Sequence, residues 1–438
     1  MNPGLTKTAL LSVLFSAALS FSDTLTLSQA ENIASENSFQ VKAAMGEKNA
    51  ARWERFSTIG TLLPSISFST NWLQFEGGDQ TIPGEQIPST GAGPAITGEG
   101  YNHQLTISQP IFNGGGEVIG YLAASSSVSA AEYQLKSARQ TAIASVREAY
   151  FNAQMLSEQK RIDSISYEWA RTNQYRAQVR YEEGVIPPYE LLRWEAEVAD
   201  RKGNLVSSSA AYKIALAQLY TSMGRTLNEG QNVELQSASL LESWYDSTAT
   251  LPAGSAQNNP DLKAAQEQLT TASRGSVLNL TQYLPSFNGF VQYTWPPQDQ
   301  LFPQGDNFWT YGIQANWTLF SGAQRYSDYR KSQFQLEALS AQTEQLNETV
   351  QISIFQSRTQ FIASKEQVSA AKSRYELMQR TLSMVEERYE SGLVGIIDLL
   401  DTRITADSAY ILYLQSLANA IMARTAYLRA TGLLEVDR

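Results

Sequence analysis

Four charged residues stand at matched positions in the two halves of the sequence. Glu190 corresponds to Asp398, and Arg193 corresponds to Asp401, both at an offset of 208 residues. Glu190 and Asp398 fall in the first turn of an expected helix, where the helix dipole favours acidic side chains. A plain role at the helix start is therefore one interpretation of these acids. Charged side chains of these types can form ion pairs, and the acids can attract cations.

The composition excludes several kinds of reactive site. The 438 residues include no cysteine, so thiolate nucleophiles, disulfides and cysteine-bound metals are absent, and His103 is the single histidine. The sequence has no glycine-rich phosphate loop, metal-ligand cluster or nucleophile motif. Acidic residues outnumber basic ones by 43 to 33, without any run of Lys or Arg. We therefore expect no enzyme, no cofactor, no metal and no nucleic-acid partner.

The first 22 residues resemble an export signal. Lys7 supplies a positive start, residues 9–21 are apolar, and small residues precede Asp23. A short buried helix is the alternative interpretation. No later segment is apolar over 18 or more residues, so the sequence predicts no transmembrane helix. If the exported chain crosses a membrane, it must use strands.

An internal repeat organises the rest of the chain. The repeat is recognised from four matches in the same order: Arg180-Tyr181-Glu182-Glu183-Gly184 with Arg388-Tyr389-Glu390-Ser391-Gly392, Leu191-Leu192 with Leu399-Leu400, Ile111-Phe112-Asn113-Gly114 with Leu319-Phe320-Ser321-Gly322, and Leu63-Pro64-Ser65 with Leu284-Pro285-Ser286. The boundaries are residues 23–224 for the first repeat, 225–257 for a linking segment that we expect to pack as a collar, 258–433 for the second repeat and 434–438 for a short tail. Each repeat is predicted to run helix, strand pair, long helix, turn, helix.

Strand pairs are predicted at about 64–112 and 285–320. Apolar and polar residues alternate there with period two, over the 9–12 residues that a tilted strand needs to cross a bilayer. Aromatic residues near the strand ends favour a lipid-facing surface, although a soluble sheet with one buried face has the same alternation. The connections at 76–100 and 296–307 are rich in Gly and Pro and are predicted to be long external loops.

Long helices follow each strand pair. Residues 116–182 and 323–390 contain no proline, and helices of that size would be roughly 100 Å long. Shorter helices are expected at about 28–62 and 260–283. Apolar residues at spacings of three and four continue beyond residue 396 and indicate a coiled-coil seam, in which Asp407 is the one polar member.

Four strands cannot close a membrane barrel, and an open strand edge in lipid leaves backbone groups unpaired. The predicted fold class is therefore mainly α with a small β part. Long coiled-coil helices form an α-barrel, and the four strands of each protomer contribute to a trimeric transmembrane β-barrel of about 12 strands. A trimeric coiled-coil surface stalk or adhesin is the alternative, but it has no need of matched strand hairpins.

The ordered set of signal, repeat, hairpins, proline-free helices and Arg-Tyr-x-x-Gly turns resembles the TolC family of outer-membrane efflux proteins over nearly the whole chain. The resemblance implies a homotrimer in outer-membrane lipid, with a helical tunnel in the periplasm. It also implies a periplasmic adaptor protein and an inner-membrane pump of the RND or ABC type, docked at a closable tip. The exported substrate is left open: drugs, metal ions, metabolites and polypeptides all fit a passive duct.

The resemblance also assigns positions at the tip. Tyr389, Gly392, Asp398 and Asp401 match a family pattern whose aspartates ring the constriction. By the repeat offset, Glu190 joins them, and Arg193 is a hypothetical latch partner for Asp401. Val394 stands where the best-known member has a latching arginine, so the same latch is not implied here.

The turns Gly184-Val185 and Gly392-Leu393 resemble tip turns that meet the adaptor. A glycine that ends a helix is the alternative interpretation of both turns.

Overall fold

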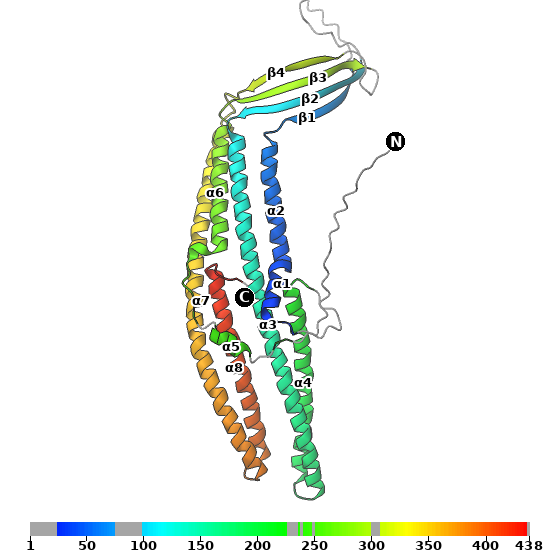
Figure 1. The fold of residues 1–438 in the computed structure, drawn as a ribbon, viewed down its shortest axis with the longest axis vertical. Coiled ribbons are helices and arrows are strands. Elements are labelled where there is room, and N and C mark those ends of the chain that lie inside the picture. Colours follow the sequence, from blue (N-terminus) through cyan, green and yellow to red (C-terminus); the bar gives the residue numbers. More distant parts are fainter. Residues whose placement is uncertain are drawn as a thin grey trace, which may run out of the picture.

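The computed structural model describes residues 24–74, 99–225, 235–236, 240–247, 250–298 and 307–435. The expected export signal at 1–22 and most of both expected external loops lie outside these ranges. The described chain is mainly helical and elongated, with one small sheet at an end (Figure 1). Among the described helices, none combines the length and the apolarity needed to span a bilayer.

The sheet contains four antiparallel strands in the order β1-β2-β3-β4, namely Ser65–Gln74, Glu99–Asn113, Ser286–Gln298 and Phe308–Asn316. Each predicted strand pair forms a hairpin, and β2 joins the two hairpins by pairing with β3. The alternation was expected to continue to residue 319, but β4 ends at Asn316. The outer edges of β1 and β4 have no partner within the described chain.

Two helices of 67 residues dominate the molecule: α3 (Gly116–Glu182) and α7 (Gln324–Glu390). Each turns back into a helix of 35 residues, α4 (Pro188–Ser222) or α8 (Ile396–Ala430). The proline-free stretches therefore predicted the long helices almost to the residue. Near the sheet, α3 lies between α2 (Phe39–Gly60) and α6 (Pro260–Thr281), with α7 beyond α6. At the far end, α3 and α8 bring the two hairpins together.

The single helix expected at 28–62 is wrong, because the structure divides it into α1 (Leu27–Asn37) and α2. The break falls at Ser38, whose backbone is extended at φ −57° and ψ 147°. Its hydroxyl accepts a hydrogen bond from the Val41 amide and so caps α2. Helical periodicity continues across the break, so hydrophobic spacing alone did not reveal it.

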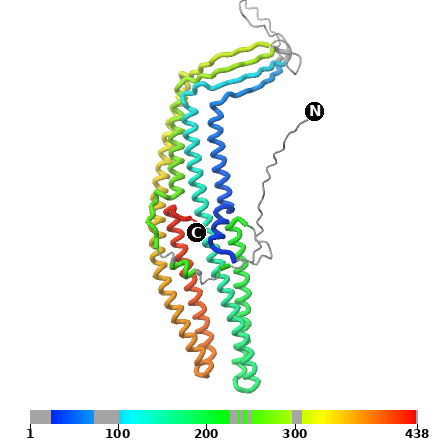
Figure 2. The backbone as a smooth tube through the Cα atoms, viewed as in Figure 1, coloured from blue at the N-terminus to red at the C-terminus, as the bar shows by residue number. Residues whose placement is uncertain are grey.

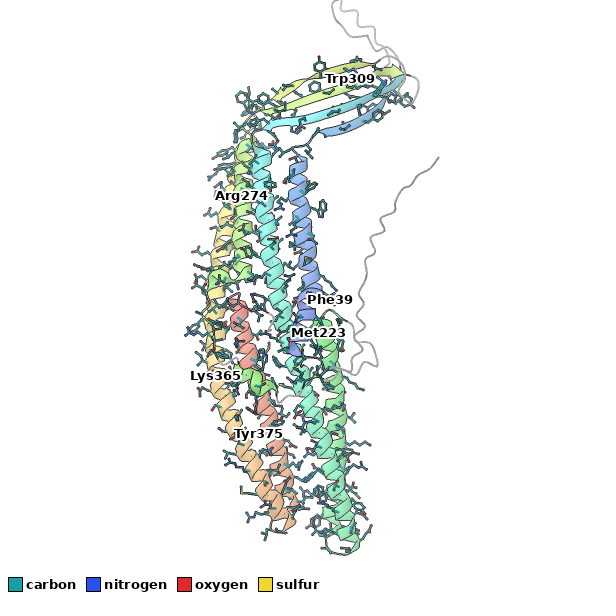
Figure 3. The ribbon with its side chains drawn as sticks, viewed as in Figure 1. Phe39, Met223, Arg274, Trp309, Lys365 and Tyr375 are labelled. Atoms are coloured by element: carbon teal, nitrogen blue, oxygen red, sulfur yellow. The ribbon has the colours of Figure 1, made fainter. Side chains whose placement is uncertain are left out.

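Both repeats use the same joint where a hairpin returns to the middle of the molecule. Gly224 after α4 and Gly432 after α8 are left-handed, at φ 73° and 70°. A Cβ at Gly224 would overlap the backbone of Asn37, and one at Gly432 would overlap the backbone of Asn258. Figure 3 shows the end of α4 at Met223 at the same level as Phe39, where α2 begins.

The largest core lies at this middle level, where α3 holds several non-helical segments. The side chain of Gln140 donates to the Leu434 carbonyl, and Tyr150 donates to the Leu25 carbonyl. Between them, Arg147 forms a fully buried ion pair with Glu31 at 2.5 Å. Polar side chains on one stripe of α3 thus satisfy backbone groups that no helix satisfies.

The linking segment was expected to form a collar, and its described part includes α5 (Leu240–Ser247). Leu241 is buried in the middle core, and Trp244 packs against Phe151 of α3 with ring centroids 5.7 Å apart. The trace in Figure 2 shows α5 beside α8, part of the way along that helix. That this segment encircles the helices remains a prediction.

Candidate functional site

The two helix turns lie side by side at the end of the molecule opposite the sheet (Figure 1). Gly184 and Gly392 are left-handed, at φ 73° and 71°. The amides of the residues that follow them donate back to the carbonyls of Arg180 and Arg388, both at 2.8 Å. Each turn is thus a Schellman-type helix ending, in which glycine takes the left-handed position.

The residues after these glycines present apolar side chains to water. Val185 is 61% exposed and Leu393 is 69% exposed. Because a helix ending needs no exposed aliphatic residue here, both turns offer a small apolar contact surface in addition to closing their hairpins.

The predicted charged residues take different environments at the helix starts. Glu190 and Asp398 lie in the first turns of α4 and α8, as expected. Glu190 is half-buried, whereas Asp398, Asp401 and Arg193 are exposed. In the described part of one protomer, no ion pair joins Arg193 to Asp401.

An apolar cluster joins the two hairpins just behind the turns. It consists of buried residues from both hairpins with two half-buried aromatic residues packed against them: Ala177, Ile186, Leu191, Trp194, Ile396, Leu400, Trp169 and Tyr389. The rings of Trp169 and Trp194 meet edge to face, with centroids 5.4 Å apart. Edge-to-face contact is a favoured geometry for aromatic pairs.

Arg403 of α8 contacts both the other hairpin and the partner helix of its own hairpin. Its guanidinium carbon lies 4.6 Å from the centroid of the Trp169 ring on α3. Its Nη1 atom lies 3.0 Å from a carboxylate oxygen of Glu386 on α7. Arg403 therefore links three helices, with its charge shared between an aromatic face and a carboxylate.

A cavity of about 440 Å³ lies between the hairpins beside Arg403. Glu190 and Tyr389, two of the predicted site residues, line it together. Burial, and secondarily the negative charge of Glu190, raise the pKa of the Tyr389 hydroxyl. The hydroxyl therefore remains a neutral hydrogen-bonding group at neutral pH.

The site therefore contains two sets of residues. Glu190 and Tyr389 come together inside it, whereas Asp398, Asp401 and Arg193 stay on the outer surface of the protomer. Sequence reasoning missed Arg403, Trp169 and Glu386 as site residues. No motif marks them, because their contact joins positions that only the packing of α8 on α3 brings together.

Paired 67-residue helices that carry a four-stranded sheet at one end and helical turns at the other are the architecture of outer-membrane efflux channels. The model of the family "Outer membrane efflux protein" matches residues 30–225 and 251–433. The chain belongs to this family. It is a passive exit duct of the outer membrane, whose helical tunnel lies in the periplasm. A comparison with curated proteins gave no match.

Solved structures share this fold. The outer membrane channel CmeC of Campylobacter jejuni matches with a TM-score of 0.72 and 17% identity, covering 93% of this chain and 85% of that one. VceC of Vibrio cholerae matches with a TM-score of 0.69 and 15% identity, covering 93% and 96%. The open state of the MtrE channel of Neisseria gonorrhoeae matches with a TM-score of 0.68 and 15% identity, covering 93% and 89%.

Proposed function

We propose that three copies of this chain form the duct of a tripartite efflux or type I secretion system. The sheets close into one barrel in outer-membrane lipid, and the helices close into one tunnel. A periplasmic adaptor and an inner-membrane pump of the RND or ABC type complete the system. The duct carries out no reaction of its own and needs no cofactor.

The observation that supports this assembly is the pair of open lateral edges. β1 and β4 end the sheet, and α2 and α7 end the helical layer beside it. On α2, Trp53, Phe56 and Ile59 form a stripe that is exposed in the protomer. An unpaired strand edge in lipid costs several kcal/mol for each bare backbone group. Pairing β4 of one copy with β1 of the next removes both edges.

The assembly is tested by purification in detergent. A closed barrel gives a band that migrates differently before and after heating, the mass of a trimer and current across a planar bilayer. The stalk alternative predicts none of the barrel properties. A monomer that dissolves without detergent and carries no current would refute the proposed duct.

The acids of the tip are proposed to line the constriction. Asp398 and Asp401 lie exposed at the start of α8, so three copies would bring six carboxylates towards one axis and favour cations. Asp398→Asn with Asp401→Asn should lower the cation preference, measured as the reversal potential in a salt gradient. If these acids serve only the helix start, the reversal potential stays the same.

Arg193 is proposed to pair with Asp401 across neighbouring copies. Arg193→Ala should then raise the resting conductance in planar bilayers. Unchanged conductance would mean that this latch does not exist, without affecting the other tip residues.

The exposed turns are the proposed contacts of the adaptor. Val185→Asp or Leu393→Asp places a charge on the apolar surface and should weaken cross-linking to the adaptor of the same export system. Gly184 and Gly392 are needed to form the turns. If both variants cross-link to the adaptor as well as the unmodified protein does, the turns serve only to end their helices.

A further inference from the structure

Asp407 is the one charged residue in the apolar seam of α8, and neither the duct nor the tip explains it. In the structure, Asp407 lies where α8 packs beside the hairpin formed by α3 and α4. Ser166 of α3 donates a hydrogen bond to an Asp407 carboxylate oxygen at 3.2 Å. Asp407 also lines a cavity of about 790 Å³, together with residues of α3 and α4. A carboxyl group therefore lies at the joint between the two hairpins.

Charged groups face Asp407 from each helix around it. Asp163 comes from α3, Arg201 from α4 and Arg403 from α8 itself. Each arginine already has its own acid. Arg201 pairs with Glu197 at 2.5 Å, and Arg403 pairs with Glu386 of α7 at 3.0 Å. The Asp163 carboxylate accepts a hydrogen bond from Gln159 at 2.9 Å and is nearly buried.

The environment of Asp407 therefore disfavours its charged form. Burial raises the pKa of its carboxyl, and this effect exceeds the lowering by Arg403, Ser166 and Arg201, while Asp163 adds to the rise. If the hairpins separate, the half-buried carboxyl of Asp407 becomes more fully hydrated and its pKa falls towards the ordinary value. Protonation consequently stabilises the packed arrangement, and this stabilisation is lost as pH rises through the raised pKa.

We propose that Asp407 makes the joint between the hairpins of each protomer sensitive to protons, so that acidification of the periplasm holds the tip closed. The proposal rests on the proposed duct, in which the two hairpins must separate for the tip to open. It assigns to Asp407 a regulatory role that the tip acids do not have, because those acids are exposed in the protomer.

The first test is the pH dependence of resting conductance in planar bilayers. Conductance of the unmodified trimer should fall as the pH is lowered through the raised pKa of Asp407, by up to about tenfold for each unit by which packing raises that pKa. In a trimer that also carries Asp398→Asn and Asp401→Asn, which removes the tip acids, Asp407→Asn should give low conductance without this dependence because its side chain is neutral at every pH. Asp163→Asn removes the neighbouring negative charge and should move the midpoint to lower pH. Asp200→Asn, an exposed acid on α4, is the matched control and should respond like the unmodified protein.

The result that overturns the proposal is an Asp407→Asn trimer that keeps the unmodified pH response. Higher conductance of that variant at pH 7.5 would also overturn it, because the neutral side chain should favour closure. A midpoint unmoved by Asp163→Asn would show that the two carboxyls are not coupled as proposed.

A second measurement separates failure of the joint from failure of the duct. The chain has no cysteine, so Ser208→Cys introduces a single thiol into the cavity beside Asp407. At a fixed pH of 7.5, a maleimide should label this thiol more slowly when Asp407→Asn is also present. Equal labelling rates with and without Asp407→Asn would refute the proposed role of Asp407 at the joint, even if the trimer conducts. If no variant conducts, the duct is refuted while the labelling still tests the joint.

Discussion

Arg403 contributes a charged contact between the hairpins. It stacks on Trp169 and pairs with Glu386, and its side chain is only 15% exposed. Arg403→Met keeps the aliphatic stem but removes the charge. We expect a loss of about 1–2 kcal/mol, which shifts the ratio of closed to open tips roughly 5–30-fold. Resting conductance in planar bilayers should rise accordingly.

Two further variants make this prediction specific. Arg403→Lys keeps the charge without the planar guanidinium. Its conductance should therefore lie between those of the unmodified protein and Arg403→Met. Arg380→Met removes an exposed arginine from α7 and serves as the control. Equal conductance of Arg403→Met and Arg380→Met would show that the stacked arginine does not hold the hairpins together.

Prediction from sequence was least complete for single residues. Glu190 and Tyr389 were found because the repeat places them at its turns, and the structure brings them into one cavity. Trp194 was not among the predicted site residues. Arg403 and Trp169 gave no signal, because one sequence shows the period of each helix but not which faces of α3 and α8 meet. The roles of the predicted tip residues remain to be tested.

Among the elements, the long helices were predicted best and the divided helix worst. Proline interrupts helices, so a proline-free stretch of this length favours one continuous helix. α3 and α7, with 67 residues each, occupy almost the whole of the two stretches. The break at Ser38 depends on one backbone angle and one capping hydroxyl. Serine occurs in many helices of this chain, so its type did not indicate the break. At the break, Gly224 from another element packs closely on Asn37, a contact that the spacing of one helix does not reveal.

The glycines at the helix ends allow a matched comparison. Gly184 and Gly224 are both left-handed at φ 73°, but a Cβ would meet nothing within 4 Å at Gly184, whereas at Gly224 it would overlap the Asn37 carbonyl. Gly184→Ala should cost about 1–2 kcal/mol for the left-handed backbone alone. Gly224→Ala should cost about 1–3 kcal/mol more, because the joint must shift.

Thermal unfolding followed by circular dichroism in detergent checks this order. The midpoint of Gly224→Ala should lie clearly below that of Gly184→Ala. Equal midpoints would show that the end of α4 can move away from α1 and α2 without loss of stability.

For the whole molecule, the exposed stripe on α2 should govern assembly. Trp53 and Phe56 meet edge to face, with centroids 5.6 Å apart, on the outer edge of the helical layer. A large apolar side chain buried between copies contributes roughly 1.5–3 kcal/mol. Trp53→Ser with Phe56→Ser should therefore weaken the trimer, measured as a lower temperature at which the oligomeric band is lost on a gel.

The control for assembly is Tyr121→Ser on α3, which has neighbouring helices on both sides within the protomer. This variant should lose its oligomeric band at the same temperature as the unmodified trimer. If the α2 variant also keeps that temperature, the stripe does not lie between copies.

The stripe of polar side chains on α3 has a consequence for the connectivity of the chain. Through Tyr150 and Gln140, it holds residues 25 and 434 ten positions apart on one helix, a separation of about 15 Å. A linker of about eight residues can bridge that distance. A circular permutant that joins these ends and opens between α5 and α6, behind a fresh export leader, should therefore assemble into the same conducting trimer. The order of the two halves along the gene would then be a historical accident, with no bearing on the shape of the pore.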